Sequence, residues 1–132
     1  MNEAEGSAGL AATPQYQYAQ RIGDQLFVAG QVPNDALGYI VSHGDPQAQA
    51  TQCLLNLRTV LAVHGFTTTD IRRLVVYVVG EQAALSAAWS AVTEFFSGTV
   101  PPATLLGVAR LGYDAQLVEI DATVLKATQG DA

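Results

Sequence analysis

Clusters of apolar residues divide the chain into short strands and two longer helices. Residues 17–32 (QYAQRIGDQLFVAGQV) predict a short strand, a turn at Gly23-Asp24 and a second, aliphatic strand, which is the pattern of a β-hairpin. Residues 39–45 (YIVSHGD) predict a third, shorter strand. Residues 70–80 (DIRRLVVYVVG) form a valine-rich run that is too short for a helix, so we expect a buried central strand there.

Two segments carry apolar residues at helical spacing. The first runs from Pro46 to His64, with Asp45 suited to the N-cap and Gly65 to the C-terminal stop. Its apolar face consists of Ala50, Leu54, Leu57 and Leu61. The second spans roughly residues 81–97, and its buried positions are Leu85, Trp89, Val92 and Phe96.

The last patterned stretch, residues 101–124 (PPATLLGVARLGYDAQLVEIDATV), predicts two strands that form a final hairpin. Pro101 and Pro102 precede it because proline cannot continue the helix before them. A carboxylate, Glu119, stands in the mainly apolar second strand. The pattern alone leaves open whether Glu119 lies on a solvated face or serves a function.

The order of these elements predicts an α+β fold, a mixed β-sheet of about six strands with two helices packed on one face. Some strand residues have the pattern of positions buried on both faces, namely Val76, Val78, Leu106 and Val108. A monomer rarely leaves an apolar sheet face in water. We therefore expect self-association through the open face, and a closed ring would leave no unmatched surface.

Length and composition narrow the class of protein. At 132 residues the chain suffices for one domain, which we place at residues 14–127, between flexible tails at 1–13 and 128–132. No apolar run approaches the ~20 residues of a membrane span. The net charge of −6, with only 6 scattered Lys and Arg residues, argues against a nucleic-acid partner. The N-terminus shows no signal peptide, so the expected location is the cytoplasm.

Conventional catalytic motifs are absent, among them GxGxxG, HExxH, GxSxG and the phosphate-binding loop. His43 and His64 fall on different elements, so we expect no metal site. Cys53 stands alone, which excludes an internal disulfide and a cysteine-based metal site. We expect Cys53 to be a small buried hydrophobe, because no basic residue beside it would lower its pKa.

Four stretches of this sequence match, in the same order, motifs of a known protein family. They are YxxAxRIGDQLFVAGQVP from Tyr16, DPQAQATQCLLNLRTVLAVHGFTTTDIRRLVVYV from Asp45, EFF from Glu94, and PPAT…GVARL…LVEIDA from Pro101. Together, over about residues 16–126, they resemble the Rid family, also called the YjgF/UK114 family. The resemblance implies a chorismate-mutase-like α+β fold, a homotrimer whose sheets form a central barrel, and small-molecule sites in the clefts between subunits.

The best-known branch of this family hydrolyses reactive enamines and imines, such as 2-aminoacrylate, to ketoacids and ammonia, and it needs no cofactor. Its sites combine an arginine that binds the substrate carboxylate, a glutamate that handles water, a first-strand tyrosine and backbone groups after the second strand. By this resemblance Tyr16 matches the tyrosine and Glu119 matches the catalytic glutamate. Gly30 matches the backbone position, with Ala29 in place of the usual serine.

The arginine is replaced in this chain. The family pattern Pro-Ala-Arg, fifteen residues before the glutamate, reads PAT here, which puts Thr104 at the arginine position. One hydroxyl cannot replace a bidentate guanidinium. Arg110 lies six residues farther along the same strand, ~20 Å away. Arg72 and Arg73 belong to a different strand, and the sequence does not say whether either approaches Thr104.

The second predicted helix also departs from the family pattern. Trp89 and Val92 stand where the typical helix carries an asparagine and a tyrosine. Taken alone, Trp89 indicates packing in the core or at an interface. With the resemblance, Trp89 and Thr104 are candidates to line a substrate pocket that is bulkier and more apolar than usual.

Two interpretations of Glu119 remain. As a functional group it would orient water or transfer a proton at a carbon–nitrogen double bond in a partly buried cleft. As a structural group it would be solvated or hydrogen-bonded, inherited with the scaffold. Asp121 shares its strand face and occupies a usual acidic position, so it is the natural control.

Two classes of function also remain. The first is a cofactor-free hydrolase or deaminase of a small imine or enamine that lacks the carboxylate handle, and therefore not the standard 2-imino acid deaminase. The alternative is a non-catalytic trimeric module that binds a small metabolite or serves a partner protein. Ribonuclease activity has been ascribed to some relatives, and the acidic charge balance argues against it here.

Overall fold

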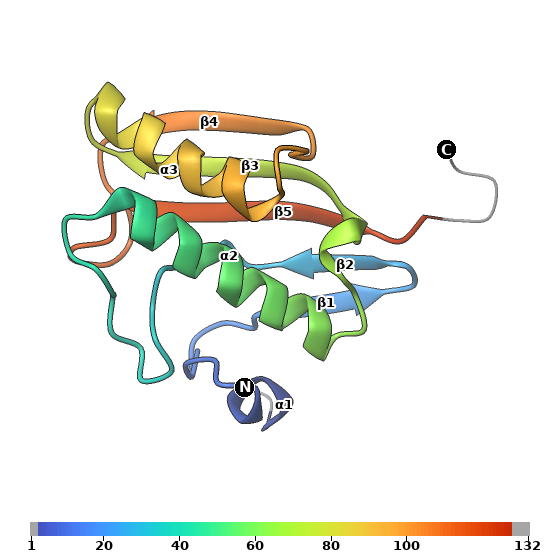
Figure 1. The fold of residues 1–132 in the computed structure, drawn as a ribbon. Helices are drawn as coiled ribbons and strands as arrows, with labels where there is room; N and C mark the ends of the chain where they lie inside the picture. The colour runs from blue at the N-terminus through green and yellow to red at the C-terminus, as the bar shows by residue number, and fades with distance from the viewer. Residues whose placement is uncertain (1–2, 128–132) are drawn as a thin grey trace.

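The computed structural model describes residues 3–127, which form a five-stranded sheet with two long helices on one side (Figure 1). The strands lie in the order β1-β2-β5-β3-β4. Their bounds are β1 Ala19–Ile22, β2 Gln25–Val28, β3 Ile71–Val79, β4 Ala103–Val108 and β5 Val118–Leu125. The helices are α1 Glu3–Ser7, α2 Pro46–Val63 and α3 Gln82–Phe95, with a 3₁₀ turn at Thr68–Asp70.

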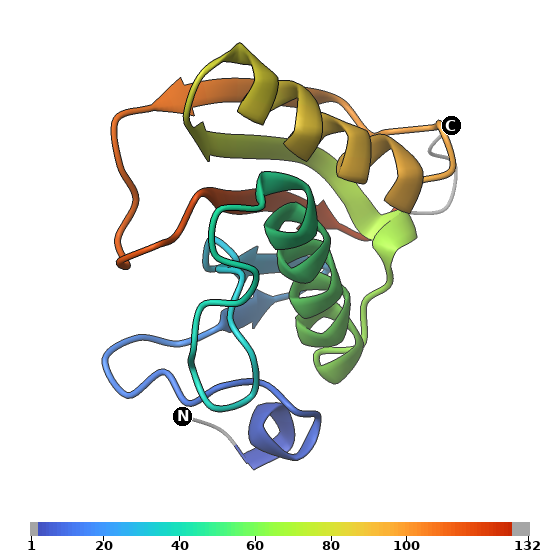
Figure 2. The ribbon, with the colours of Figure 1, turned by 60° about the vertical axis from the view of Figure 1, so that its left-hand side comes forward.

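Helices α2 and α3 lie on the same side of the sheet (Figures 1 and 2). The hydrophobic core is formed by side chains from this pair of helices and from the sheet. Apolar side chains of α2 pack against every second residue of the central strands β3 and β5, and both sets of side chains are buried. The fully buried members include Leu54, Leu57, Leu61, Leu74, Val76, Val78, Ile120 and Val124. The predicted α+β class, with both helices on one face, is confirmed.

The predicted first hairpin and both predicted helices are present. β1 and β2 pair antiparallel around a turn in which Gly23 has φ +59°. Asp45 caps α2, since its Oδ1 accepts a hydrogen bond of 3.0 Å from the Ala48 N–H. Pro46 follows as the first helical residue, and Gly65 turns the chain after the helix at φ +82°.

The predicted final hairpin is wrong. β4 and β5 are not neighbours, because β3 lies between them. β4 pairs parallel with β3, whereas β5 runs antiparallel to both β3 and β2. The helical crossover through α3 returns the chain beside β3 in the parallel direction. β5 has an apolar face that fits the centre of the sheet, so residues 109–117 carry the chain past β3 instead of forming a tight turn.

The predicted strand at residues 39–45 is also wrong. Only one isolated bridge, between Asn34 and Ile40, occurs there. Ser42 and Gly44 adopt positive φ values of 50° and 81°, which turn the chain out of an extended path. The sheet formed by the described residues therefore has five strands rather than about six.

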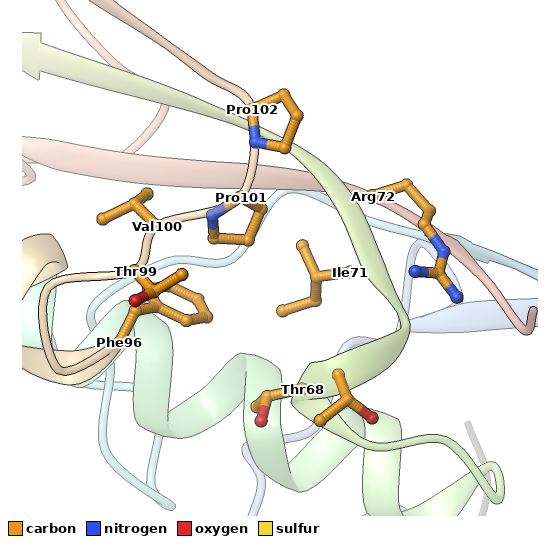
Figure 3. A pocket seen from close by; sticks show the side chains of 9 residues that line it. Thr68, Ile71, Arg72, Phe96, Thr99, Val100, Pro101 and Pro102 are labelled. Atoms are coloured by element: carbon orange, nitrogen blue, oxygen red, sulfur yellow. The ribbon is translucent and has the colours of Figure 1, made fainter. Parts of the chain in front are cut away.

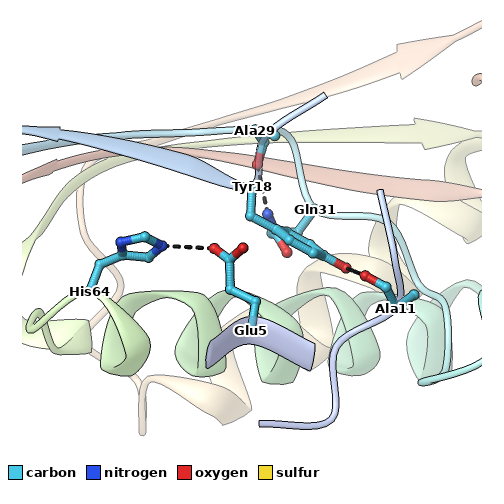
Figure 4. A network of polar contacts seen from close by, with 6 residues as sticks. All are labelled: Glu5, Ala11, Tyr18, Ala29, Gln31 and His64. Carbon is cyan, nitrogen blue, oxygen red and sulfur yellow. Dashed lines mark hydrogen bonds and ion pairs between the residues drawn. The ribbon is translucent and has the colours of Figure 1, made fainter. Parts of the chain in front are cut away.

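The N-terminal segment differs from the expected flexible tail. α1 packs beside the C-terminal end of α2, and Leu10 and Ala11 are buried. Figure 4 shows Glu5, which is 1% exposed, paired with His64 at 2.7 Å, and the Tyr18 hydroxyl donating to the Ala11 carbonyl at 2.8 Å. Local composition misses this segment because long-range contacts fix it. The other expected tail, residues 128–132, lies outside the described residues.

The central strands β3 and β5 bury only one of their faces within a single chain. Val76 and Val78 point to the helices and are fully buried, but Leu106 is 41% exposed on the opposite, open face. One chain therefore has the open apolar face that the sequence indicated, whereas its burial by self-association stays a prediction. Several large apolar residues remain on the open face or its edge, namely Ile22, Phe27, Leu106 and Leu125.

Candidate functional site

Glu119 lies on the open face near the start of β5. Its neighbours Val118 and Ile120 point into the core, so strand alternation turns the Glu119 side chain to the other side. On the neighbouring strand β3, its partner in the pairing is Tyr77. Glu119 is half-buried, in the intermediate range between core and surface. The structure thus places this carboxylate, half-buried, on the open face of the central strand rather than in bulk solvent.

Gly30 supplies the space that the Glu119 carboxylate occupies. A Cβ atom at Gly30 would lie 2.5 Å from Glu119 Oε2 and 3.0 Å from its Cδ. Such distances are far inside van der Waals contact, so any side chain here would push the carboxylate away. The backbone on both sides is fixed, because Gln31 and Ile120 exchange N–H···O bonds of 2.7 and 3.1 Å. Gly30 and Glu119, both expected from the resemblance, are therefore in direct contact.

A buried amide network holds the other side of the carboxylate. Gln116 Nε2 donates to Glu119 Oε1 at 3.2 Å and to the Val118 carbonyl at 3.1 Å. The segment that carries Gln116 is itself held by Gln49, a fully buried residue of α2. Gln49 donates to the Ala115 carbonyl at 3.0 Å, and its Oε1 accepts from the Leu117 N–H at 2.7 Å. Glu119 is thus oriented from both ends before any ligand binds.

Tyr16 and Tyr113 are hydrogen-bonded to each other through their side chains, near this carboxylate. Burial is the main cause that raises the pKa of Tyr16 well above that of free tyrosine, followed by its hydrogen bond with Tyr113. The nearby charge of Glu119 adds to the effect. Tyr16 is therefore a neutral phenol at physiological pH, able to donate a hydrogen bond but not to act as a base. A cavity of about 290 Å³ adjoins both rings and is bordered by Thr13 and Asn34.

Cys53 lies on the helix side of the same strand. It is fully buried, and its Sγ contacts the Val118 carbonyl at 3.6 Å. Burial raises the pKa of the Cys53 thiol, and the Glu119 charge acts in the same direction. Cys53 is thus a buried, protonated thiol, which confirms the expectation of a small core residue.

Thr104 lies on the open face of β4, away from Glu119. Thr104 pairs with Val75, whereas Glu119 pairs with Tyr77 on the other side of β3. Two strand spacings and two residues along the strand separate the Cα atoms of Thr104 and Glu119 by ~12 Å. Thr104 has a partner of its own, because Arg73 Nη2 donates to its Oγ1 at 2.7 Å.

Trp89 belongs to the other layer of the molecule. It lies in α3 and packs, half-buried, against the core cluster between helices and sheet. The sheet separates α3 from the open face that carries Glu119 (Figure 1). Within one chain, Trp89 and Glu119 do not share a site.

A cavity of about 450 Å³ lies between the start of β3 and the segment that leads from α3 into β4. Figure 3 shows its apolar wall, formed by Ile71, Phe96, Val100 and Pro101, with Arg72 at the edge. None of the expected site residues lines it. Within residues 3–127, no group of three or more His, Cys, Asp or Glu side chains could hold a metal ion, and no helix is long and apolar enough to cross a membrane.

Sequence reasoning missed two residues of this region, Tyr113 and Gln116, and one contact, that between Arg73 and Thr104. Tyr113 and Gln116 lie in the irregular segment between β4 and β5, where no periodicity marks a residue as important. Arg73 was noticed, but its contact with Thr104 depends on the parallel pairing of β3 and β4, which the predicted hairpin did not contain. A parallel pairing inferred from the β3–α3–β4 order would have placed Arg73 near Thr104.

Known proteins resemble this chain over most of its length. The family model described as Endoribonuclease L-PSP matches residues 6–126. A RutC family protein from Pyrococcus horikoshii is 30% identical over 113 residues, which cover 84% of this chain and 86% of that protein. A 2-iminobutanoate/2-iminopropanoate deaminase from Salmonella typhimurium is 29% identical over 118 residues, which cover 88% of this chain and 91% of that protein.

The fold comparison leads to the same group of proteins. The crystal structure of the YjgF gene product from Escherichia coli is similar with a TM-score of 0.79 at 25% identity, covering 91% of this chain and 94% of that one. The match of the family model to almost the entire described chain decides the assignment. The protein belongs to the Rid (YjgF/UK114) family, whose fold it shares.

Proposed function

We propose that this protein is a cofactor-free hydrolase of small reactive imines or enamines, in which Glu119 handles water. The observation that carries the proposal is the preorganised carboxylate: Glu119 fits against Gly30 and accepts a hydrogen bond from Gln116. A neutral Tyr16 beside it supplies a hydrogen-bond donor. Membership of the Rid family supports the reaction class, since relatives include a 2-iminobutanoate/2-iminopropanoate deaminase.

The proposed reaction needs one group that both accepts and returns a proton. Glu119 takes a proton from water while the water oxygen bonds to the carbon of the protonated imine, whose C=N π electrons move to nitrogen, which gives a neutral carbinolamine. Glu119 then returns that proton to the amine nitrogen. The carbon–nitrogen bond breaks and ammonia leaves as Glu119 takes the proton of the carbinolamine hydroxyl and the carbonyl forms; Glu119 finally releases this proton to solvent. When substrate binds, the Tyr16 hydroxyl donates its single hydrogen to a polar atom of the substrate in place of Tyr113. An enamine enters the same route after protonation at carbon.

We further propose that the working site lies between copies of the chain. Glu119 and Thr104 of one chain are ~12 Å apart at their Cα atoms, on opposite sides of β3, and a small imine cannot bridge that distance alone. A homotrimer with the open sheet faces turned inward would bring Glu119 of one copy toward Thr104 of another. The exposed apolar residues Phe27 and Leu106 on that face support such burial.

The substrate is proposed to differ from the standard 2-imino acids. Those substrates carry a carboxylate next to the imine carbon, and the position that the family pattern fills with arginine is Thr104 here. A threonine hydroxyl gives one neutral donor in place of a charged, bidentate one. We therefore expect Thr104 to bind the carboxylate of 2-iminobutanoate much more weakly than an arginine would.

A panel of imines made in situ tests this proposal. Amino acid oxidase generates 2-imino acids, amine oxidase generates imines without an adjacent carboxylate, and semicarbazide traps whatever is not hydrolysed. We expect the purified protein to reduce trapping of the second group and to have little effect on 2-iminobutanoate. Turnover of 2-iminobutanoate as the best substrate would contradict the argument from Thr104. Ligand binding without turnover of any imine would favour a non-catalytic module.

The close contact at Gly30 gives a second test. Gly30→Ala is expected to lower turnover about 100-fold, because its methyl group would displace the Glu119 carboxylate by ~1 Å. Gly107→Ala is the matched control: a Cβ there would meet Leu85 at an ordinary 3.7 Å on the helix side of the sheet. Turnover is measured in the same trapping assay. Equal rates for the two variants would show that the position of Glu119 is unimportant.

A further inference from the structure

The open face holds an arginine that the proposed reaction does not yet use. Arg73 Nη2 donates a 2.7 Å hydrogen bond to Thr104 Oγ1. It is the sole hydrogen bond of the Arg73 side chain among residues 3–127, and no carboxylate within that range lies within 4.0 Å of it. The guanidinium therefore keeps most of its donors for a further partner.

A break in the strand register explains why Arg73 points to this face. Ile71 pairs with Val124 and Arg73 with Thr123, so Arg72 is an extra residue on β3. The bulge allows Ile71 to stay in the core while Arg73 joins the open face that carries Thr104. Arg72 is directed elsewhere, since its Nε donates to the Leu125 carbonyl at 2.8 Å.

The pair has the chemistry of an anion site. The Thr104 oxygen accepts from Arg73, so its own hydroxyl hydrogen remains available to donate. All remaining groups of the pair are thus donors, one of them charged. If a second copy covers this face, as the proposed function requires, a guanidinium without an anionic partner would be costly to bury. A bound anion would remove that cost.

We propose that Arg73, positioned by Thr104, binds the carboxylate of this protein's substrate. The inference rests on the proposed function for the class of substrate. The guanidinium of Arg73 lies beside the Thr104 hydroxyl, close to the sheet that carries it. An arginine at position 104 would instead extend its guanidinium away from the sheet. The carboxylate is then held farther from Glu119 of the facing copy. The substrate is accordingly an imine whose carboxylate is separated from the imine carbon by additional methylene groups.

Binding of stable oxo acids tests the assignment without any turnover. The probes are 2-oxobutanoate, 4-oxopentanoate and the neutral 4-oxopentanamide, titrated into the full-length protein and followed by calorimetry or NMR. We expect 4-oxopentanoate to bind at least ~10-fold more tightly than its amide, as a charge-assisted hydrogen bond implies. It should also bind more tightly than 2-oxobutanoate, because Arg73 is proposed to hold the carboxylate farther from Glu119 of the facing copy.

Two glutamine variants isolate Arg73. Arg73→Gln should bind the acid and the amide equally, whereas Arg72→Gln, which removes the same charge one residue away, should keep the preference for the acid. Both side chains are exposed, so both variants should fold. Loss of the preference in both variants, its survival in Arg73→Gln, or no binding of either acid to the unaltered protein would overturn the proposal.

Moving the arginine tests the set-back position. The double variant Arg73→Thr with Thr104→Arg keeps the composition and carries the charge outward from β4, so 2-oxobutanoate should become the preferred acid. An unchanged order would overturn the proposed spacing. The outcome is separable from the hydrolase proposal: Arg73-dependent binding without imine turnover would refute the hydrolase alone, and turnover without Arg73-dependent binding would refute this assignment alone.

Discussion

Replacing Glu119 by glutamine is expected to lower kcat by ~10²–10⁴-fold on any imine that the protein hydrolyses. Glutamine keeps the shape of the side chain and can still contact Gln116, but it cannot accept a proton from water. The free energy of unfolding should change little, because Glu119 is half-buried and lies outside the core. The rate is measured by the trapping assay, and folding by circular dichroism and Tm.

Asp121→Asn provides the control for that substitution. Asp121 is two residues farther along β5, on the same face and with the same intermediate burial. It pairs with Val75 and has no close approach to Gly30. Its amide variant should turn over imines at nearly the unaltered rate. Equal losses in both variants would point to the summed charge of the face, and no loss in either would return Glu119 to a structural role.

Local signals in the sequence predicted the elements that local interactions fix. Asp45 and Pro46 start α2 through a cap and a fixed φ, and Gly65 permits the turn after it. The final hairpin failed because strand pairing is decided by non-local burial. β5 has the apolar face that the middle of the sheet needs, and that requirement overrides its closeness in sequence to β4.

The site was predictable only where its residues stand in regular elements. Glu119 and Gly30 could be chosen by resemblance, and their contact follows from the bridge between Gln31 and Ile120. Tyr113 and Gln116 could not, since an irregular segment carries no period that distinguishes a functional residue from a solvated one. Their positions depend on buried hydrogen bonds from α2 that only the tertiary structure reveals.

The separation of Glu119 from the Arg73–Thr104 pair makes an assembly experiment decisive. In the proposed homotrimer, Glu119→Gln would lack the proposed water-handling group and Arg73→Ala would lack the proposed anion-binding group, so each variant alone should be nearly inactive. If a site takes one group from each of two neighbouring copies, co-expression of both variants should restore about a quarter of the sites, because one arrangement in four unites two intact halves. Rates are measured on the whole co-expressed protein, without selecting trimers by composition, so that the random share of a quarter applies.

A matched mixture excludes a site contained in one chain. When the unaltered chain is co-expressed in equal amount with a chain that carries both substitutions, a site shared between copies survives only where two unaltered chains meet, in about a quarter of cases. A site within one chain would survive in about half, and the two single variants would then restore nothing. Mixtures that both retain about a quarter of the activity therefore require the carboxylate of one copy to act on a substrate held by the arginine of the next.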